Sequence, residues 1–359
     1  MILDRLSDLQ ADLARRFSGE LRFDPYTRLL YSTDASSYQI EPLGVGFPRT
    51  FDDVQHAVEV CAKQNVPLLA RGGGSSLAGQ AVGRALILDF SKHLNQIVEI
   101  NSEEGWAVCE PGVVCDALTH AAKPCGLMYG CDPASSNRAT VGGMVANNST
   151  GAHSVLYGMT ADHVLSADVI LADGSTAALS QTSSPPELLS AITGIVHRHA
   201  DSIRTRYPKT WRRSSGYSLN YLLPYAASRP HGWDGAFVGA VSNRDAYPAP
   251  TPTNLAKLLV GSEGTLAVLT RVKLNLVPRP KKTALCILHF DSIAQAADAT
   301  PAILESNPSA IELMDRMMID LTREVPAYAR LLTWVQGNPA AVLIVEFYGD
   351  SDDELIAKV

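Results

Sequence analysis

The stretch LLARGGGSSLAGQAVGRALILDF, residues 68–90, places three consecutive glycines between two apolar runs. The run before the glycines has the length and composition of a short buried strand, and Ala85–Asp89 predicts a second strand after the loop. A loop without side chains lets the backbone approach a ligand closely and lets several N–H groups point at one anion. The stretch therefore predicts an anion site between two strands, with a tight turn that binds nothing as the structural alternative.

The two standard nucleotide-binding loops do not match this stretch. A dinucleotide fingerprint needs G-x-G-x-x-G opening a helix, but counting from Gly72 the third glycine position holds Leu77, and a strand follows Gly83. A P-loop needs a lysine after its last glycine, and no lysine occurs between residues 64 and 91. If the loop binds a phosphate, its backbone has to do so.

Two further segments are unusually rich in small residues. They are CDPASSNRATVGGMVANNSTGAHSVLYGMTADHV, residues 131–164, and VGSEGTLAVLT, residues 260–270. Their amide and hydroxyl groups suit a polar, planar ligand, whereas close backbone packing is the alternative for each segment alone. Three such segments separated by ordinary sequence favour a shared ligand site.

The composition is that of an ordinary globular protein with room for two or three domains. The chain has 359 residues, 19% of them charged, with a net charge of −7, which argues against a nucleic-acid partner. No apolar run approaches the roughly 20 residues that a membrane span needs. Residues 1–19 predict an amphipathic helix without the features of a secretory signal. The six cysteines are scattered, match no zinc or iron–sulfur spacing, and suggest reduced thiols in a cytoplasmic protein.

The order of predicted elements is mixed α+β with many strands of about five residues. A helix is expected from Phe51 to about Gln64, with Thr50 to Asp53 as its cap, and a strand over residues 266–278. A Pro-, Ala- and Gly-rich stretch predicts a surface insertion at about residues 224–254. The prolines near residue 279 mark a boundary, so we expect domains at 1–278 and 279–359.

In combination, these motifs resemble the FAD-binding domain of the vanillyl-alcohol oxidase superfamily, the PCMH-type fold shared with MurB. RGGGSSLAGQ matches the pyrophosphate loop, PASSNRATVGGMVANNSTGAHSVLYG the flavin-cradling segment, and GYSLNYLL with VGSEGTLAVLT the third signature. The match is to the glycolate oxidase, D-lactate dehydrogenase and D-2-hydroxyglutarate dehydrogenase branch. The resemblance implies two subdomains around FAD, followed by a partial ferredoxin-like cap domain.

The resemblance implies cofactor-binding roles for residues of all three segments. They are Arg71, Gly72, Gly73, Gly74, Ser75, Ser76, Leu77, Gly79, Gln80, Pro133, Ser135, Thr140, Val141, Gly142, Gly143, Ala146, Asn147, Asn148, Gly151, Val164, Val169, Glu263, Gly264 and Thr265. Relatives that attach FAD covalently often carry a histidine where this chain has Ser75, so the flavin is expected to be non-covalent.

Candidates for substrate binding are Arg212, Arg213 and Tyr217, which match a basic-x-x-x-Gly-Tyr pattern near the flavin. An arginine fork suits a substrate carboxylate, and a surface role is the alternative. His153 and His163 either face the flavin or are hydrogen-bonded structural histidines. No metal site is expected, and no catalytic base is assigned.

The resemblance implies oxidation of a D-2-hydroxy acid (D-lactate, D-2-hydroxyglutarate or glycolate) by hydride transfer to flavin N5. The electron acceptor stays open between an iron–sulfur partner, a quinone and oxygen. The chain stops early in the expected cap, which suggests the N-terminal part of a longer FAD and iron–sulfur dehydrogenase, so a flavin-binding module with little activity alone is an alternative. A cytoplasmic location is expected, with peripheral attachment at the inner face of the membrane left open.

Overall fold

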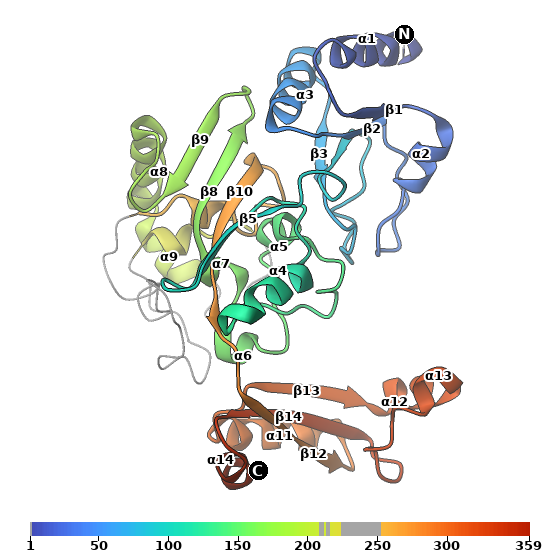
Figure 1. Ribbon diagram of the computed structural model, residues 1–359, viewed down its shortest axis with the longest axis vertical. Helices are drawn as coiled ribbons and strands as arrows, with labels where there is room; N and C mark the ends of the chain where they lie inside the picture. Colours follow the sequence, from blue (N-terminus) through green and yellow to red (C-terminus); the bar gives the residue numbers. More distant parts are fainter. Residues whose placement is uncertain (1, 208–211, 213–215, 224–252) are drawn as a thin grey trace.

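The computed structural model describes residues 2–207, 212, 216–223 and 253–359 (Figure 1). The insertion expected at about 224–254 lies almost wholly outside these residues. Within them, an N-terminal α/β unit and a central antiparallel unit stand side by side, and a C-terminal domain lies below the central unit in Figure 1. The mixed α+β class expected from the sequence is confirmed.

The N-terminal unit is a four-stranded sheet in the order β1-β2-β4-β3, in which β2, β4 and β3 run parallel. Its helix α3 begins at the cap that the sequence predicts: Thr50 accepts a hydrogen bond from the backbone N–H of Asp53, whose carboxylate accepts one from the N–H of Thr50. Buried leucines, valines and alanines of α1, α3 and β4 form its core. The elements are α1 (Ile2–Ala14), β1 (Glu20–Arg22), α2 (Pro25–Leu30), β2 (Gly44–Phe47), α3 (Phe51–Gln64), β3 (Leu68–Arg71) and β4 (Leu86–Asp89).

The central unit is a five-stranded antiparallel sheet in the order β5-β6-β10-β8-β9. Its middle strand, β10, comes last in the chain, so strands formed by residues 97–180 and by residues 267–275 meet in one sheet. The elements are β5 (Ile97–Asn101), β6 (Trp106–Cys109), α4 (Cys115–Ala122), η1 (Lys123–Cys125), β7 (Leu127–Met128), α5 (Val141–Asn147), α6 (Ser154–Tyr157), α7 (Thr160–His163), β8 (Val164–Leu171), β9 (Thr176–Ser180), α8 (Pro186–Arg198), α9 (Ala200–Arg206), η2 (Leu219–Leu222), α10 (Ala256–Leu259), β10 (Ala267–Asn275) and β11 (Val277–Pro278).

The C-terminal domain is a three-stranded antiparallel sheet in the order β12-β14-β13. With α11 and α14 on one face, this is the β-α-β-β-α portion of a ferredoxin-like arrangement. The core lies between that face and the two helices, and it contains Leu343, Phe347 and Leu355. The elements are β12 (Lys282–Phe290), α11 (Ile293–Leu304), β13 (Ala310–Asp315), α12 (Arg316–Glu324), α13 (Pro326–Ala329), β14 (Ala341–Gly349) and α14 (Asp352–Lys358).

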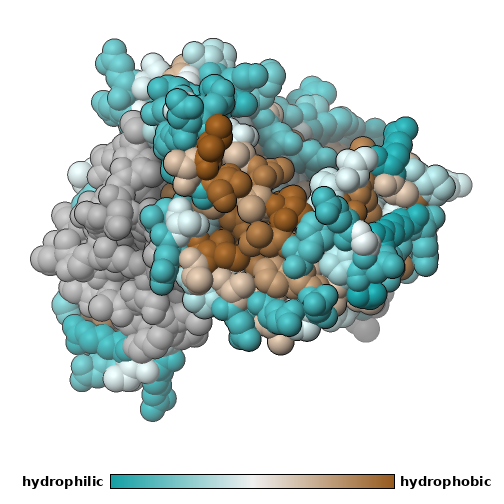
Figure 2. Space-filling model, turned by 90° about the horizontal axis from the view of Figure 1, so that it is seen from below, coloured by the Kyte–Doolittle hydropathy of each residue, from teal (hydrophilic) through white to brown (hydrophobic). Residues whose placement is uncertain are grey.

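Much apolar surface stays exposed in the C-terminal domain. Figure 2 views the molecule from the side of this domain and shows hydrophobic residues gathered on that face. Its large exposed apolar side chains are Leu285, Ile293, Leu313, Met317, Met318, Leu321, Val325, Tyr328, Leu331, Ile356 and Val359. Among the described helices of the whole chain, none has both the length and the apolar character to cross a bilayer.

Candidate functional site

A cavity of about 1150 Å³ lies between the N-terminal and central units. It is larger than the roughly 300–1000 Å³ of pockets for drug-sized ligands, as a dinucleotide requires. All three small-residue segments line it, at residues 68–81, 133–150 and 259–269. The fold thus brings together segments that lie up to two hundred positions apart, as a shared ligand site needs.

Most of the residues implied by the resemblance line this cavity. They are Arg71, Gly72, Gly73, Gly74, Ser75, Ser76, Leu77, Gln80, Pro133, Ser135, Thr140, Gly142, Gly143, Ala146, Asn147, Asn148, Glu263, Gly264 and Thr265. The structure does not place the other five at its wall: Gly79, Val141, Gly151, Val164 and Val169. Val164 and Val169 are buried in β8 instead, where they belong to the core of the central unit.

The glycine loop after β3 forms one wall with its backbone. In the described part of the chain, the N–H groups of Gly73, Gly74, Ser75 and Ser76 have no intramolecular hydrogen-bond acceptor. Gly74 has a φ of 63°, a left-handed conformation that glycine adopts without strain. Successive free N–H groups beside a cavity make an anion site.

Arg71 lines the same wall but directs its donors away from a ligand. Its guanidinium donates to the carbonyl oxygens of Tyr31 (3.2 Å), Thr33 (2.8 Å) and Ala81 (2.9 Å). It also lies over the ring of Tyr31, at 5.0 Å from the centroid, and Tyr31 in turn donates to Asp89 at 2.5 Å. Burial lowers the pKa of Arg71, yet a guanidinium stays charged at neutral pH. Arg71 therefore braces the loop from behind.

Gly72 and Gly73 serve a purpose that the sequence did not suggest. Neither has a positive φ. A Cβ added to Gly72 would lie 1.9 Å from Oγ1 of Thr140, and one added to Gly73 would lie 2.2 Å from the carbonyl oxygen of Arg138. These glycines let the loop touch the central unit at the base of the cavity, because no side chain fits there.

The second wall is built around α5, whose N-cap is Thr140. The N–H of Gly142 donates to the carbonyl of Pro111 at 2.8 Å, and a Cβ on Gly142 would lie 2.7 Å from Cβ of Pro111. Asn148 ends the helix with a φ of 59°, and its Oδ1 accepts from the N–H of Ala161 at 3.0 Å. Close backbone contacts hold this wall in place.

The third segment ties the two walls together through Glu263. Its N–H donates to the carbonyl of Ala146 at 2.9 Å, and its carboxylate accepts from Nδ2 of Asn147 at 3.2 Å. Burial raises the pKa of Glu263, and hydrogen bonds from Asn147 and Gln80 partly offset this. Because Gln80 belongs to the glycine loop, Glu263 contacts all three segments at once.

Sequence reasoning missed the apolar floor of the cavity. It consists of apolar side chains of the three segments, among them Leu68, Phe90, Met144 and Leu269, together with Pro111 and Leu259. A signal existed for Leu269, since the alternation predicted for the strand at 266–278 puts Ala267 and Leu269 on the same face. Pro111 lies outside the quoted segments, and tertiary packing alone brings it to the cavity.

The polar candidates outside the cavity wall have structural partners. A nitrogen of the Arg212 guanidinium donates to the carbonyl of Gly151 at 3.4 Å. The hydroxyls of Tyr217 and Thr265 are 2.9 Å apart, which places Tyr217 beside the cavity rim. Arg213 lies outside the described residues.

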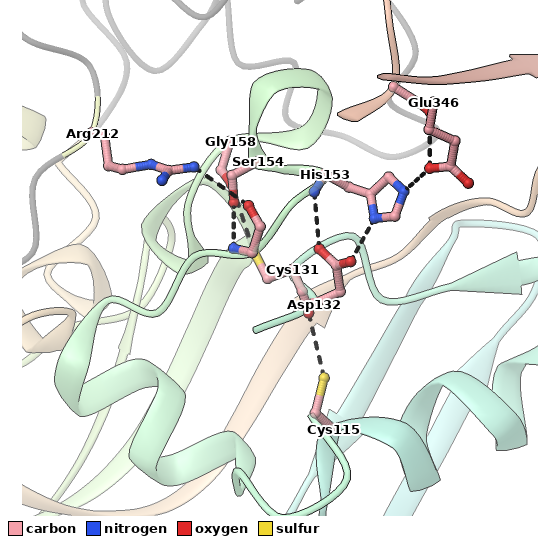
Figure 3. A network of polar contacts seen from close by, with 10 residues as sticks. Cys115, Cys131, Asp132, His153, Ser154, Gly158, Arg212 and Glu346 are labelled. Carbon is pink, nitrogen blue, oxygen red and sulfur yellow. Dashed lines mark hydrogen bonds and ion pairs between the residues drawn. The ribbon is translucent and has the colours of Figure 1, made fainter. Parts of the chain in front are cut away.

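The two histidines of the second segment have different surroundings. His163 is fully buried, its ring nitrogens lie 2.9 and 3.2 Å from the carbonyls of Tyr157 and Asn275, and burial lowers its pKa to about 4. This is the structural alternative expected from the sequence. His153 contacts the carboxylates of Asp132 and Glu346 (Figure 3).

The walls fit FAD on their own chemistry. Residues with free N–H groups line the cavity and can serve as donors to a pyrophosphate, amide and hydroxyl side chains of residues 147–150 suit a ribityl chain and a polar ring, and the floor is apolar. In the described lining, Arg71 and Glu263 are the titratable side chains. Three of the Arg71 N–H groups are bonded to backbone carbonyls, so the loop N–H groups are the main donors that this wall offers to the phosphates.

Comparisons with known proteins agree with this reading. Residues 42–180 match a family described as "FAD binding domain", and residues 279–359 match "FAD linked oxidases, C-terminal domain". D-2-hydroxyglutarate dehydrogenases of Pseudomonas putida and Escherichia coli are each 32% identical, over 96% and 99% of this chain. Glycolate oxidase subunit GlcD of Bacillus subtilis is 30% identical over 92% of this chain and 57% of its own length.

The chain spans about a third of the length of these dehydrogenases, since it covers 34% of each. Among solved structures, an alkyldihydroxyacetonephosphate synthase matches with a TM-score of 0.63 and 18% identity, over 95% of this chain and 56% of that one. That likeness shows a shared fold.

Proposed function

We propose that this chain, which belongs to the FAD-linked oxidases with a PCMH-type FAD-binding domain, is the flavin-binding part of a D-2-hydroxy-acid dehydrogenase. The observation that carries the proposal is the row of free N–H groups at residues 73–76, which belong to residues that line a cavity of dinucleotide size. The similarity to D-2-hydroxyglutarate dehydrogenases and to a glycolate oxidase subunit supports the substrate class.

In this proposal each wall has a separate task. The loop N–H groups bind the pyrophosphate, and Asn147, Ser149 and Thr150 supply hydrogen-bonding groups to the ribityl chain and the flavin ring. The apolar floor excludes water from that side. Bound FAD supplies the two-electron acceptor for oxidation of the carbon that bears the substrate hydroxyl.

The substrate class follows from chemistry that D-lactate, D-2-hydroxyglutarate and glycolate share, an α-hydroxy carboxylate. Arg212 is exposed and lies near the second segment through its contact with Gly151. A guanidinium there suits a substrate carboxylate. Electrons then pass to an iron–sulfur, quinone or other carrier, and a cytoplasmic location with or without peripheral membrane attachment is part of the proposal.

Flavin content tests the first half of the proposal. The purified 359-residue chain, incubated with FAD and desalted, is expected to be yellow, and acid precipitation should leave the flavin in the supernatant because Ser75 offers no attachment nitrogen. Colour that stays in the pellet contradicts non-covalent binding. A folded sample that retains no flavin contradicts the site itself.

Anaerobic reduction tests the second half. D-2-hydroxyglutarate, D-lactate or glycolate should bleach the flavin faster than L-lactate does, and dithionite serves as the control for a competent cofactor. A positioned base contributes about 10²–10⁴ in rate. Since the described lining offers Glu263 as its one carboxyl group, we expect bleaching well below ordinary turnover of about 1–10³ per second. Equal rates with D- and L-lactate contradict the substrate class.

A further inference from the structure

Three charged side chains join the flavin-binding domain to the C-terminal domain (Figure 3). Nδ1 of His153 lies 2.5 Å from Oδ2 of Asp132, and Nε2 of the same ring contacts Oε2 of Glu346 on β14. Asp132 directly precedes the cavity residue Pro133, and His153 follows the cavity residue Thr150 by three positions. The cluster thus connects two stretches of the cavity wall to the C-terminal sheet.

Both carboxylates are held in place independently of the imidazole. The backbone N–H of His153 donates to Oδ1 of Asp132 at 3.2 Å, and the hydroxyl of Ser309 donates to Oε2 of Glu346 at 3.1 Å. The ring of His153 stacks on Tyr348, with centroids 5.3 Å apart and planes 22° from parallel. The imidazole therefore lies in a preformed slot between two fixed acceptors.

Two carboxylate acceptors require two N–H donors, and only the protonated imidazole has both. Burial disfavours the cation, but the hydrogen bonds to Asp132 and Glu346 outweigh burial and raise the pKa of His153 to about 9. The two carboxylates leave one negative charge in excess when the imidazole is charged, and two when it is neutral.

The other titratable groups around the cluster do not change their protonation state between pH 7 and 10. Burial raises the pKa of Tyr157 on α6 and of Tyr348 on β14, so both hydroxyls stay neutral. The positive charge of Arg279 partly offsets the raised pKa of Tyr348, and Arg212 donates to a nearby backbone carbonyl. Burial also raises the pKa of the Cys115 and Cys131 thiols, which interact with Asp132, so both stay neutral. Among the described residues around the cluster, His153 is therefore the group that titrates in that range.

We propose that His153 is a positioning residue whose positive charge holds β14, and with it the C-terminal sheet, against the wall of the flavin cavity. β13 of the same sheet packs on α6, which begins directly after His153. Loss of the proton leaves the neutral ring with one N–H for two carboxylates, and a buried charge without its partner is costly. The C-terminal domain is then expected to lose its fixed position.

The sign of the pH dependence follows from the raised pKa. A histidine whose pKa rises on docking contributes stabilisation that is complete below its ordinary value near 6.5. That stabilisation is lost as the pH rises through about 9. The domains should be fixed at pH 7.5 and released at pH 10.5.

The distance between spin labels on the two domains measures this directly. Ser102→Cys and Asp298→Cys provide exposed sites in the central unit and on α11, and Cys125 and Cys286 are replaced by alanine to prevent stray labelling. Double electron–electron resonance should give a narrow distance distribution at pH 7.5 and one at least about twice as wide at pH 10.5. The inference does not depend on the proposed substrate, because the measurement uses no flavin or hydroxy acid.

Three variants separate charge from shape. Glu346→Gln should give a wide distribution at both pH values. His153→Arg, which keeps the positive charge at pH 7.5 and at pH 10.5, should give a narrow distribution at both. Glu312→Gln is the matched control, since Glu312 is an exposed residue on the same face of the sheet, and it should behave like the unchanged chain.

Histidine NMR gives an independent readout of the same charge. The His153 resonance is assigned by its loss in His153→Arg. Its titration midpoint should lie near pH 9 and should fall by more than about one pH unit in Glu346→Gln. The proposal is overturned if the distribution of the unchanged chain is the same at pH 7.5 and 10.5. It is equally overturned if the distance distribution of His153→Arg is wider at pH 10.5 than at pH 7.5. If Glu346→Gln does not fold by circular dichroism, the comparison of His153→Arg with the unchanged chain decides alone.

Discussion

The two walls of the flavin cavity are built from different kinds of contact. Beyond the contact of Gly72 and Gly73 with the central unit, the glycine loop is held by one side chain, since Arg71 donates to three carbonyl oxygens behind it. The wall around α5 is held by backbone packing, with Gly142 against Pro111 and Gly151 so close to Asp132 that an added Cβ would lie 2.1 Å from its carbonyl oxygen. Removing the Arg71 side chain should therefore weaken the first wall, and adding atoms at α5 should damage the second.

The difference matters because the two walls should respond differently to substitution. Side-chain hydrogen bonds can be lost while the backbone keeps its path, so a substitution in the loop should disturb the FAD site more than the stability of the protein. Close packing leaves no room for relaxation, so the α5 wall should lose stability and flavin together. Substitutions that differ by one methyl group or one guanidinium can separate the two.

The largest effect is expected for Gly142→Ala in the α5 wall. Its Cβ would lie 2.7 Å from Cβ of Pro111 and 3.0 Å from the carbonyl oxygen of that residue. Overpacking of this kind costs about 1–3 kcal/mol, so the free energy of unfolding should fall by that amount in the flavin-free protein. FAD affinity should fall by about tenfold or more, since each 1.4 kcal/mol is tenfold in a binding constant. Thermal unfolding and flavin fluorescence titration measure the two.

The neighbouring Gly143 provides the matched control for that experiment. A Cβ there has an ordinary contact of 3.4 Å with Oγ1 of Thr140, and alanine is a better helix former than glycine by about 0.5–1 kcal/mol. Gly143→Ala should keep or raise the stability of the flavin-free protein. Equal destabilisation by both variants would show that α5 is sensitive to any side chain, and that close packing at Gly142 is not the cause.

An intermediate effect is expected for Arg71→Met in the loop wall. Three carbonyl oxygens lose their donor, and an unmet buried hydrogen-bonding group costs about 1–3 kcal/mol. Water from the adjacent cavity can donate to some of these carbonyl oxygens, so the free energy of unfolding should fall by only about 1 kcal/mol. Without the brace the loop N–H groups no longer converge, and FAD affinity should fall by about tenfold. Arg71→Lys should recover little, because an ammonium lacks the guanidinium fork.

Local sequence predicted the strands and the cap of α3 but gave an incomplete reason for the glycines. Thr50 and Asp53 form the expected capping box, and the strand pairs around the glycine loop lie where apolar runs predict them. Gly72 and Gly73 were expected to make room for a phosphate. The structure shows that their missing side chains make room for Arg138 and Thr140, which is a contact between two domain halves that no local pattern encodes.

The candidate site shows the same limit. Residues of the three small-residue segments were predictable because motif spacing places them, whereas Pro111 reaches the cavity through tertiary packing alone. Arg71 was expected to bind the cofactor, and its side chain instead donates to the carbonyl of Ala81 in the loop and to those of Tyr31 and Thr33 after α2. The contact of His153 with Glu346 spans 193 positions between two domains, so spacing alone did not assign it a role.

The smallest effect is expected where the two walls are tied together, at Glu263→Gln. Glutamine keeps the acceptor oxygen for Nδ2 of Asn147 and the left-handed backbone of residue 263, so FAD affinity should change by less than about threefold, a fraction of one hydrogen bond. The pH dependence is the sharper readout. Burial raises the pKa of this carboxyl, so the native state binds its proton more tightly than the unfolded chain does. Keeping this carboxylate charged therefore lowers the free energy of unfolding, and the loss grows as the pH rises above the ordinary glutamate pKa.

It follows that Glu263→Gln should gain stability relative to the unchanged chain between pH 4.5 and 7, and that the difference should vanish towards pH 4, where both side chains are neutral. Thermal unfolding at a series of pH values measures this difference, and the exposed Glu103→Gln should show none of it. A loss of flavin as large as that of Arg71→Met would contradict the ranking. The link through Glu263 would then hold the cavity together more strongly than the brace behind its loop.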